Sequence, residues 1–236
     1  MIAKQSLPDS PGSPVLFLSG AGLPTWIWDD VRSALPDDIE TAVARRPHGA
    51  DATLAEYADA AAAEANWPSF VLVAHSSGGV VAAELLARHP NRVTGILGLC
   101  AVFPLRGHSL MDTMPLPARL ILNVALQLVG TRPPEKVIRG LCGELPEDAA
   151  DRIVADFEPE SVRLYRDTTS TRELPSTRAY VRTTEDKQLS TAAQLKSAQT
   201  LGATWTEELS TGHLPMLQDP VGVASAVKRF LTHIPS

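Results

Sequence analysis

The hydrophobic positions of this chain fall into short apolar runs separated by segments with helical periodicity. The runs that predict strands cover residues 15–18, 70–74, 93–99, 177–182 and 204–209, with a weaker run at 39–44. Helices are predicted between and after them, at residues 53–65, 80–88, 192–201 and 221–231. This alternation predicts an α/β fold, with a mostly parallel sheet and helices on both faces.

The pattern changes between about residues 104 and 175, where helix-like segments broken by prolines contain no convincing strand. We therefore expect a helical cap (lid), residues 104–175, inserted into an α/β core of residues 1–103 and 176–236. An apolar stripe in the cap is expected to pack on the core or to line a pocket; it consists of Leu120, Ile121, Val124, Ala125 and Leu128. The segment Trp26-Ile27-Trp28 has the same two readings, helix packing or the wall of an acyl pocket.

The strongest chemical signal is Ala74-His75-Ser76-Ser77-Gly78-Gly79, between a predicted buried strand and a predicted helix. A nucleophile elbow places its central residue in a strained turn and needs small residues two positions before and after it. Ser76 meets this requirement because Ala74 and Gly78 flank it, whereas Ser77 would be flanked by the large side chain of His75. Ser76 is therefore the predicted nucleophile.

A serine nucleophile needs a histidine base, and the base needs an acid that holds its tautomer. Among six histidines, only His213 lies in a loop that follows a predicted strand and precedes the last helix. Glu185 and Asp186 directly follow the strand at 177–182, so they should reach the same edge of the sheet. We favour Asp186 as the acid and keep Glu185 as the alternative.

Composition narrows the class of protein further. The chain has 236 residues and a formal net charge of −6, so it has no positive field suited to nucleic acid or anionic membranes. Its longest apolar stretch, residues 118–129, is too short to span a bilayer. The two cysteines, Cys100 and Cys142, suggest neither a disulfide framework nor a zinc site, which favours a reduced cytoplasmic protein.

These motifs together resemble the α/β-hydrolase superfamily from Val15 to Leu231, near its plant-type esterases and hydroxynitrile lyases. The pieces that carry the resemblance, besides the elbow, are Leu18-Ser19-Gly20-Ala21-Gly22, Pro47-His48-Gly49, Glu185-Asp186 and Gly212-His213-Leu214-Pro215. The resemblance implies an oxyanion hole formed by the backbone N–H groups of Ala21 and Ser77. Ser19 stands where the family usually has histidine, and the usual amino-terminal hairpin is missing, which indicates a compact member.

The resemblance implies a serine hydrolase that cleaves a small, largely apolar carboxylic ester through an acyl-enzyme on Ser76, without cofactor or metal. A thioesterase, a lactonase, a C–C bond hydrolase and a non-catalytic ligand-binding protein remain alternatives. Lyase chemistry is disfavoured because Leu214 and Gly20 replace the lysine and the hydroxyl residue typical of those enzymes, and Ser76 excludes the aspartate-nucleophile branches. The expected partner is a small acyl substrate; the sequence does not indicate an oligomeric state.

Overall fold

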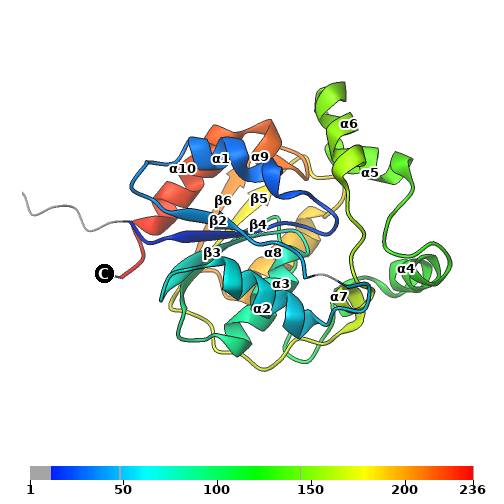
Figure 1. Ribbon diagram of the computed structural model, residues 1–236, viewed down its shortest axis with the longest axis horizontal. Helices are drawn as coiled ribbons and strands as arrows, with labels where there is room; N and C mark the ends of the chain where they lie inside the picture. Colours follow the sequence, from blue (N-terminus) through cyan, green and yellow to red (C-terminus); the bar gives the residue numbers. More distant parts are fainter. Residues whose placement is uncertain (1–11, 48, 144, 236) are drawn as a thin grey trace, which may run out of the picture.

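A computed structural model describes residues 12–47, 49–143 and 145–235, so His48 lies outside the described residues. Six strands form one sheet in the order β2-β1-β3-β4-β5-β6, and every neighbouring pair is parallel (Figure 1). The strands are β1 (Val15–Leu18), β2 (Thr41–Val43), β3 (Phe70–His75), β4 (Val93–Leu99), β5 (Thr177–Thr183) and β6 (Trp205–Leu209). The predicted fold class is confirmed. All six carboxyl ends meet at one edge of the sheet.

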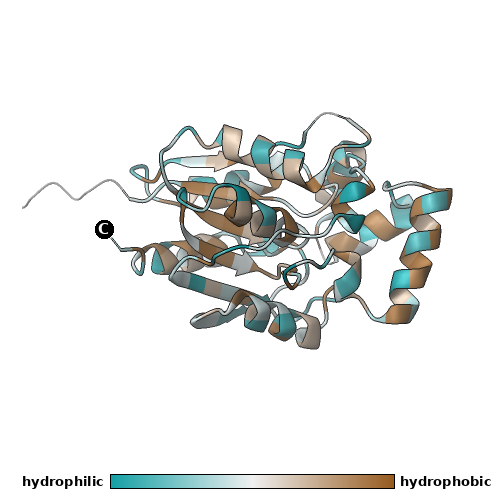
Figure 2. Cartoon of the chain, turned by 90° about the horizontal axis from the view of Figure 1, so that it is seen from below, coloured by the Kyte–Doolittle hydropathy of each residue, from teal (hydrophilic) through white to brown (hydrophobic). Residues whose placement is uncertain are grey.

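Helices cover both faces of this sheet. One face carries α1 (Asp29–Ser33), α9 (Pro215–Gln218) and α10 (Pro220–Leu231), and the other carries α2 (Leu54–Glu64), α3 (Gly78–Arg88) and α8 (Thr191–Leu201). The side chains of β1 alternate between the two layers, because Phe17 packs in the cluster that holds Phe230 and Leu16 packs in the cluster that holds Leu85. Several strands of the sheet are accordingly hydrophobic (Figure 2).

Local sequence explains where several of these helices begin and end. Thr53 and Glu56 form a capping box at the start of α2, since each side chain accepts a hydrogen bond from the backbone N–H of the other. Gly202 ends α8 in the left-handed conformation, with φ of 64°. Asp219 caps α10 by accepting the N–H of Gly222 at 2.8 Å.

Between β4 and β5 the chain forms helices only, within the part that the structure describes. They are the 3-10 helix η2 (Met111–Thr113) and the helices α4 (Leu116–Leu128), α5 (Glu135–Cys142), α6 (Glu147–Asp156) and α7 (Arg163–Arg166). The other 3-10 helix, η1 (Thr25–Trp28), lies between β1 and α1. Prolines occupy the N-cap positions of α4, α5 and α6, where a missing N–H costs no helical hydrogen bond. Helices α4, α5 and α6 lie beyond the carboxyl edge of the sheet (Figure 1).

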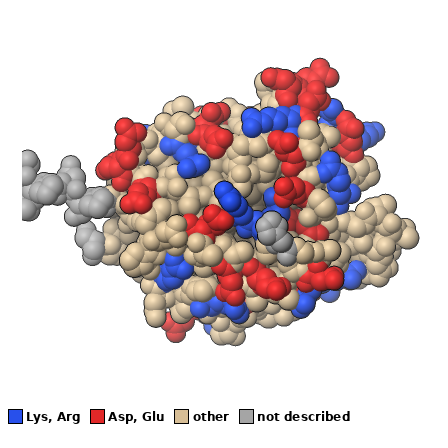
Figure 3. Space-filling model, viewed as in Figure 1, with Lys and Arg blue, Asp and Glu red and all other residues tan. Residues whose placement is uncertain are grey.

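The apolar stripe of α4 neither packs on the core nor lines a cavity, contrary to both expectations. Ile121 is 71% exposed and Leu128 is 78% exposed, and only Leu126 of this helix is buried. Polar contacts hold the opposite side of the helix, because Arg119 pairs with Asp112 and Asn123 accepts a hydrogen bond from Arg166. The stripe therefore faces outward, and the protruding region that α4 occupies carries few charges on the side seen in Figure 3.

No helix within the described residues combines the length and the apolarity that a membrane crossing requires.

Candidate active site

Ser76 lies in a strained turn between β3 and α3. Its φ is 52°, in the left-handed region that residues other than glycine rarely adopt. The turn brings the helix close to β1, since a Cβ placed on Gly78 would lie 2.6 Å from the carbonyl oxygen of Leu18. The small residue at position 78 is thus a steric requirement, and the geometry is that of a nucleophile elbow.

Ser76, His213 and Asp186 form one hydrogen-bonded chain, although they come from three separate loops. Nε2 of His213 lies 3.0 Å from Oγ of Ser76, and Nδ1 of His213 lies 2.8 Å from Oδ2 of Asp186. The loops follow β3, β6 and β5, whose carboxyl ends share one edge of the sheet. Ser76 is partly exposed, whereas His213 is 8% exposed, so the imidazole is shielded and the serine is accessible.

The environment of Asp186 fixes the tautomer of His213. Burial alone raises the pKa of the Asp186 carboxyl, but the hydrogen bond with His213 and the backbone N–H groups of Leu189 and Gln188 outweigh it and lower the pKa below its ordinary value. The hydroxyl of Thr183 also donates to Oδ2, at 3.1 Å. An ionised Asp186 accepts the proton on Nδ1, which leaves Nε2 free to accept the proton of Ser76.

Glu185, the alternative acid, is not the carboxylate that bonds the histidine, because Nδ1 of His213 pairs with Asp186. Its side chain is exposed, and its backbone N–H donates to the carbonyl oxygen of Thr211. The geometry thus brings together Ser76, His213 and Asp186, and leaves Glu185 outside the chain of hydrogen bonds.

The loop with one of the predicted oxyanion donors, Ala21, lies directly against Ser76. A Cβ placed on Gly20 would come within 2.8 Å of the Cβ of Ser76. The N–H of Ala21 donates to Oγ of Ser77 at 2.7 Å, so one predicted donor is engaged by the side chain of the residue that supplies the other. Ser19, which replaces the family's histidine, accepts a hydrogen bond from Nε1 of Trp28 at 3.0 Å.

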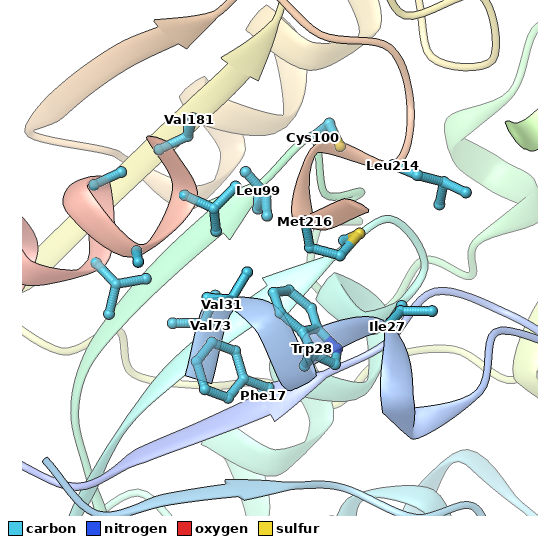
Figure 4. Packing of buried hydrophobic residues seen from close by; sticks show 14 of the residues in the cluster. Phe17, Ile27, Trp28, Val31, Val73, Leu99, Cys100, Val181, Leu214 and Met216 are labelled. Carbon is cyan, nitrogen blue, oxygen red and sulfur yellow. The ribbon is translucent and has the colours of Figure 1, made fainter. Parts of the chain in front are cut away.

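The segment Trp26-Ile27-Trp28 packs in the core cluster and lines neither of the two hollows near His213 and Asp186. Ile27 and Trp28 are fully buried, and the ring of Trp28 lies 4.7 Å from that of Phe17. Leu214 and Met216, which follow His213, belong to the same cluster (Figure 4). The residues that follow His213 therefore anchor its loop to the hydrophobic core.

His75 contacts the backbone of His213, a contact that the sequence did not reveal. Its Nε2 lies 2.8 Å from the carbonyl oxygen of His213, and since a carbonyl only accepts, Nε2 carries the proton. Burial and the neighbouring His213 lower the pKa of His75 to about 3, so the ring is neutral. Cys100 also approaches, but both nitrogens of His213 already bond Ser76 and Asp186, and burial raises the pKa of the Cys100 thiol. This donor set does not suit a metal.

Two further charged residues, Arg46 and Glu160, contact the loop of Ala21 and were not singled out from the sequence. Arg46 directly precedes the Pro47-His48-Gly49 motif, and this position next to a family motif is the one feature of the sequence that could have identified it. Glu160 belongs to no motif, so no local pattern pointed to it.

Two hollows flank the triad. One, of about 760 Å³, is bordered by His213, Thr211 and residues at the C-terminal end of α5. The other, of about 430 Å³, has a mainly apolar surface, to which Val102, Phe103, Leu110, Met114 and Leu189 contribute, and polar or charged side chains such as Asp112 and Lys196 also border it. The second begins close to the nucleophile, because the N–H of Val102 donates to the carbonyl oxygen of Ser76.

Solved structures of several hydrolases have the same fold. An extracellular α/β-hydrolase from a Paenibacillus species superposes with a TM-score of 0.80 at 19% identity, over 92% of this chain and 98% of the other. A methylesterase from Arabidopsis gives 0.75 at 15% identity, over 93% and 99%. A pyrethroid hydrolase from Sphingobium faniae gives 0.70 at 17% identity, over 94% and 98%.

Among curated protein sequences, no match was found. The sequence does match the sequence model of a protein family, the Alpha/beta hydrolase family, over residues 15–226. That span starts at β1 and ends within α10, so it includes all six strands and each loop described above. The chain belongs to the α/β-hydrolase family.

Proposed function

We propose that this protein is a serine hydrolase that cleaves small, largely apolar carboxylic esters through an acyl-enzyme on Ser76. The observation that carries the proposal is the continuous chain from Ser76 Oγ to His213 Nε2 at 3.0 Å and from His213 Nδ1 to Asp186 at 2.8 Å. Neighbouring folds that are described as a methylesterase, pyrethroid hydrolases and an esterase of polyneuridine aldehyde support ester chemistry.

In the acylation step, Nε2 of His213 takes the proton of Ser76 as Oγ attacks the ester carbonyl carbon. The carbonyl oxygen becomes an oxyanion, for which the N–H groups of Ala21 and Ser77 are the proposed donors. The tetrahedral intermediate then expels the alkoxide, and His213 returns the proton to it, so that the alcohol leaves.

In the deacylation step, water loses a proton to His213 and attacks the acyl carbon, and the carboxylic acid leaves as Ser76 recovers its proton. The hollow of about 430 Å³ beside Val102 is the proposed acyl pocket, since its lining is mainly apolar. We propose that residues 104–175 act as the cap over this site, as the sequence predicts.

Thioester, lactone and C–C substrates use the same triad and remain secondary candidates. Cyanohydrin cleavage is disfavoured by the surroundings of His213. Leu214 is fully buried and Gly20 has no side chain, so neither position supplies the cation or the hydroxyl that such lyases carry. We also propose a cytoplasmic location, which the two buried free cysteines support.

The test is labelling with a fluorophosphonate probe, followed by intact-mass analysis, together with turnover of p-nitrophenyl esters of increasing acyl length. One adduct and ester turnover are expected for the native chain and for Ser210→Ala, which removes an exposed serine near His213. Neither is expected for Ser76→Ala. If the folded native protein shows neither labelling nor turnover, the proposal fails, and a ligand-binding protein that retains the pocket becomes the better explanation.

A further inference from the structure

A buried ion pair lies beneath the loop that carries Ala21. Nε of Arg46 lies 2.5 Å from Oε1 of Glu160, and the side chains are 17% and 3% exposed. The pair joins two distant parts of the chain, because Arg46 follows β2 and Glu160 follows α6 in the predicted cap. Burial of such a pair lowers stability unless further hydrogen bonds satisfy both charged groups. Both groups have such partners in the loop of Ala21.

The guanidinium of Arg46 holds the loop on both sides of Ala21. Its Nη2 donates to the carbonyl oxygen of Leu23 at 2.5 Å and is 3.4 Å from that of Gly20. Both carbonyls therefore point toward Arg46, in the direction of the ion pair.

The carboxylate of Glu160 holds the residue between them. Its Oε1 accepts the N–H of Gly22 at 2.8 Å, and its Oε2 accepts the hydroxyl of Tyr57 at 2.7 Å. Burial and the charge of Glu160 raise the pKa of Tyr57 well above its ordinary value, so the hydroxyl stays protonated and can donate. Tyr57 in turn accepts the N–H of Ser161 at 2.9 Å, which fixes the position of the segment that carries Glu160.

Backbone and ring contacts add to this attachment at Gly22. The N–H of Glu158 donates to the carbonyl oxygen of Gly22 at 3.0 Å. Gly22 has φ of 75°, and a Cβ there would lie 1.9 Å from the ring of Phe157. Both backbone polar groups of Gly22 are thus bonded to the segment 158–160, directly beside the proposed oxyanion donor.

We infer that Arg46 and Glu160 are positioning residues for the oxyanion hole. They hold the peptide groups on either side of Ala21, and this fixes the direction of the Ala21 N–H without contact with the substrate. The inference rests on the proposed function, because a defined direction of this N–H matters only if an oxyanion forms at Ser76. Removal of one oxyanion donor lowers kcat by about 100- to 1,000-fold in serine hydrolases, so a displaced donor is expected to cost about 10- to 100-fold.

The principal variant is Glu160→Gln, which keeps the shape and the acceptor for Gly22 but removes the charge that pairs with Arg46. Arg46→Lys keeps the charge but loses the planar group that reaches two carbonyls. The matched control is Glu158→Gln, because that carboxylate lies 3.7 Å from the same guanidinium, is 70% exposed, and leaves the backbone bond to Gly22 intact. Each variant is first checked for native-like circular dichroism.

Three quantities are measured for each variant: kcat and KM for the best p-nitrophenyl ester, inhibition by a trifluoromethyl ketone of matching acyl length, and inhibition by the product acid. The ketone forms a tetrahedral adduct with an oxyanion, whereas the product acid reports binding alone. We expect Glu160→Gln and Arg46→Lys to lower kcat and the affinity for the ketone by a similar factor, with KM and product inhibition nearly unchanged. Glu158→Gln is expected to match the native chain.

The inference is overturned if Glu160→Gln and Arg46→Lys fold and keep kcat within twofold of the native value, or if ketone and product binding weaken equally. If Glu160→Gln does not fold, Arg46→Lys and Tyr57→Phe decide by the same comparison. A native chain that the fluorophosphonate does not label signals failure of the proposed function instead, which keeps the two outcomes distinct.

Discussion

The hydroxyl oxygen of Ser77 accepts a hydrogen bond from the N–H of Ala21 at 2.7 Å, so it engages the group proposed above as an oxyanion donor. In the proposed mechanism, a substrate must displace this bond before Ala21 can stabilise the transition state. The net value of such a bond is about 0.5–1.5 kcal/mol, and part of it opposes catalysis.

We therefore expect Ser77→Ala to raise kcat/KM by about 2- to 10-fold, because the variant frees the Ala21 N–H but keeps the backbone N–H of residue 77. Steady-state kinetics with a p-nitrophenyl ester measure kcat/KM of the variant and the native chain. A thermal unfolding midpoint equal to that of the native chain serves as the control for folding. A fall of tenfold or more would instead show that the Ser77 hydroxyl itself contributes to catalysis.

Asp186→Asn should lower kcat by about 10⁴-fold, since the amide cannot accept the proton on Nδ1 and favours the wrong tautomer of His213. Glu185→Gln changes an exposed side chain and should leave kcat close to the native value. The two variants remove the same charge from adjacent positions, so each controls for the other. The reverse ranking would assign the role of the acid to Glu185.

His75 makes the stability of the protein sensitive to mildly acidic pH. Burial, and secondly the neighbouring His213, lower its pKa to about 3 in the folded chain, whereas an unfolded histidine titrates near 6.5. The unfolded state therefore binds more protons below about pH 6.5, and the free energy of unfolding should fall by up to about 1.4 kcal/mol per pH unit toward pH 3.

Urea unfolding at pH 7, 6 and 5 measures this slope, above the range where the lowered pKa of Asp186 contributes. In His75→Gln the change of the free energy of unfolding with pH should lose the contribution of the one proton that His75 takes up on unfolding. His233→Gln, at an exposed histidine, should keep the native slope. Equal slopes for the native chain and His75→Gln would contradict the assignment.

Gly22→Ala should be more harmful than the same change at Gly107. The two glycines have φ of 75° and 74°, so backbone strain is matched, but a Cβ meets the ring of Phe157 only at position 22. We expect a loss of about 1 kcal/mol for Gly107→Ala from the positive φ and about 1–3 kcal/mol more for Gly22→Ala from the clash. Only Gly22→Ala should also lower kcat. If the two variants have similar unfolding midpoints and similar kcat values, the ring of Phe157 moves aside without a loss of stability.

The parallel sheet was predictable because its signals are local. Each strand is a short apolar run, and Ser76, Asp186 and His213 each follow such a run, so parallel pairing alone brings them to one edge. The residues that were missed act over long separations without periodicity. Gly22 and Glu160 are 138 positions apart in the sequence, and so are His75 and His213, whose backbone carbonyl His75 bonds. The outward direction of α4 was also missed, because hydropathy identifies an apolar stripe but not the polar contacts that orient the helix.

The attachment of Gly22 to residues 158–160 has a consequence for exchanging parts between relatives. A chimera that grafts another hydrolase's 104–175 region onto this core would discard Glu160 and leave Arg46 buried without its partner. Recombination to alter substrate range should therefore place its second junction before residue 157, or transfer Arg46 and Glu160 as a unit. Altering selectivity by point changes in the hollow beside Val102 avoids this constraint altogether.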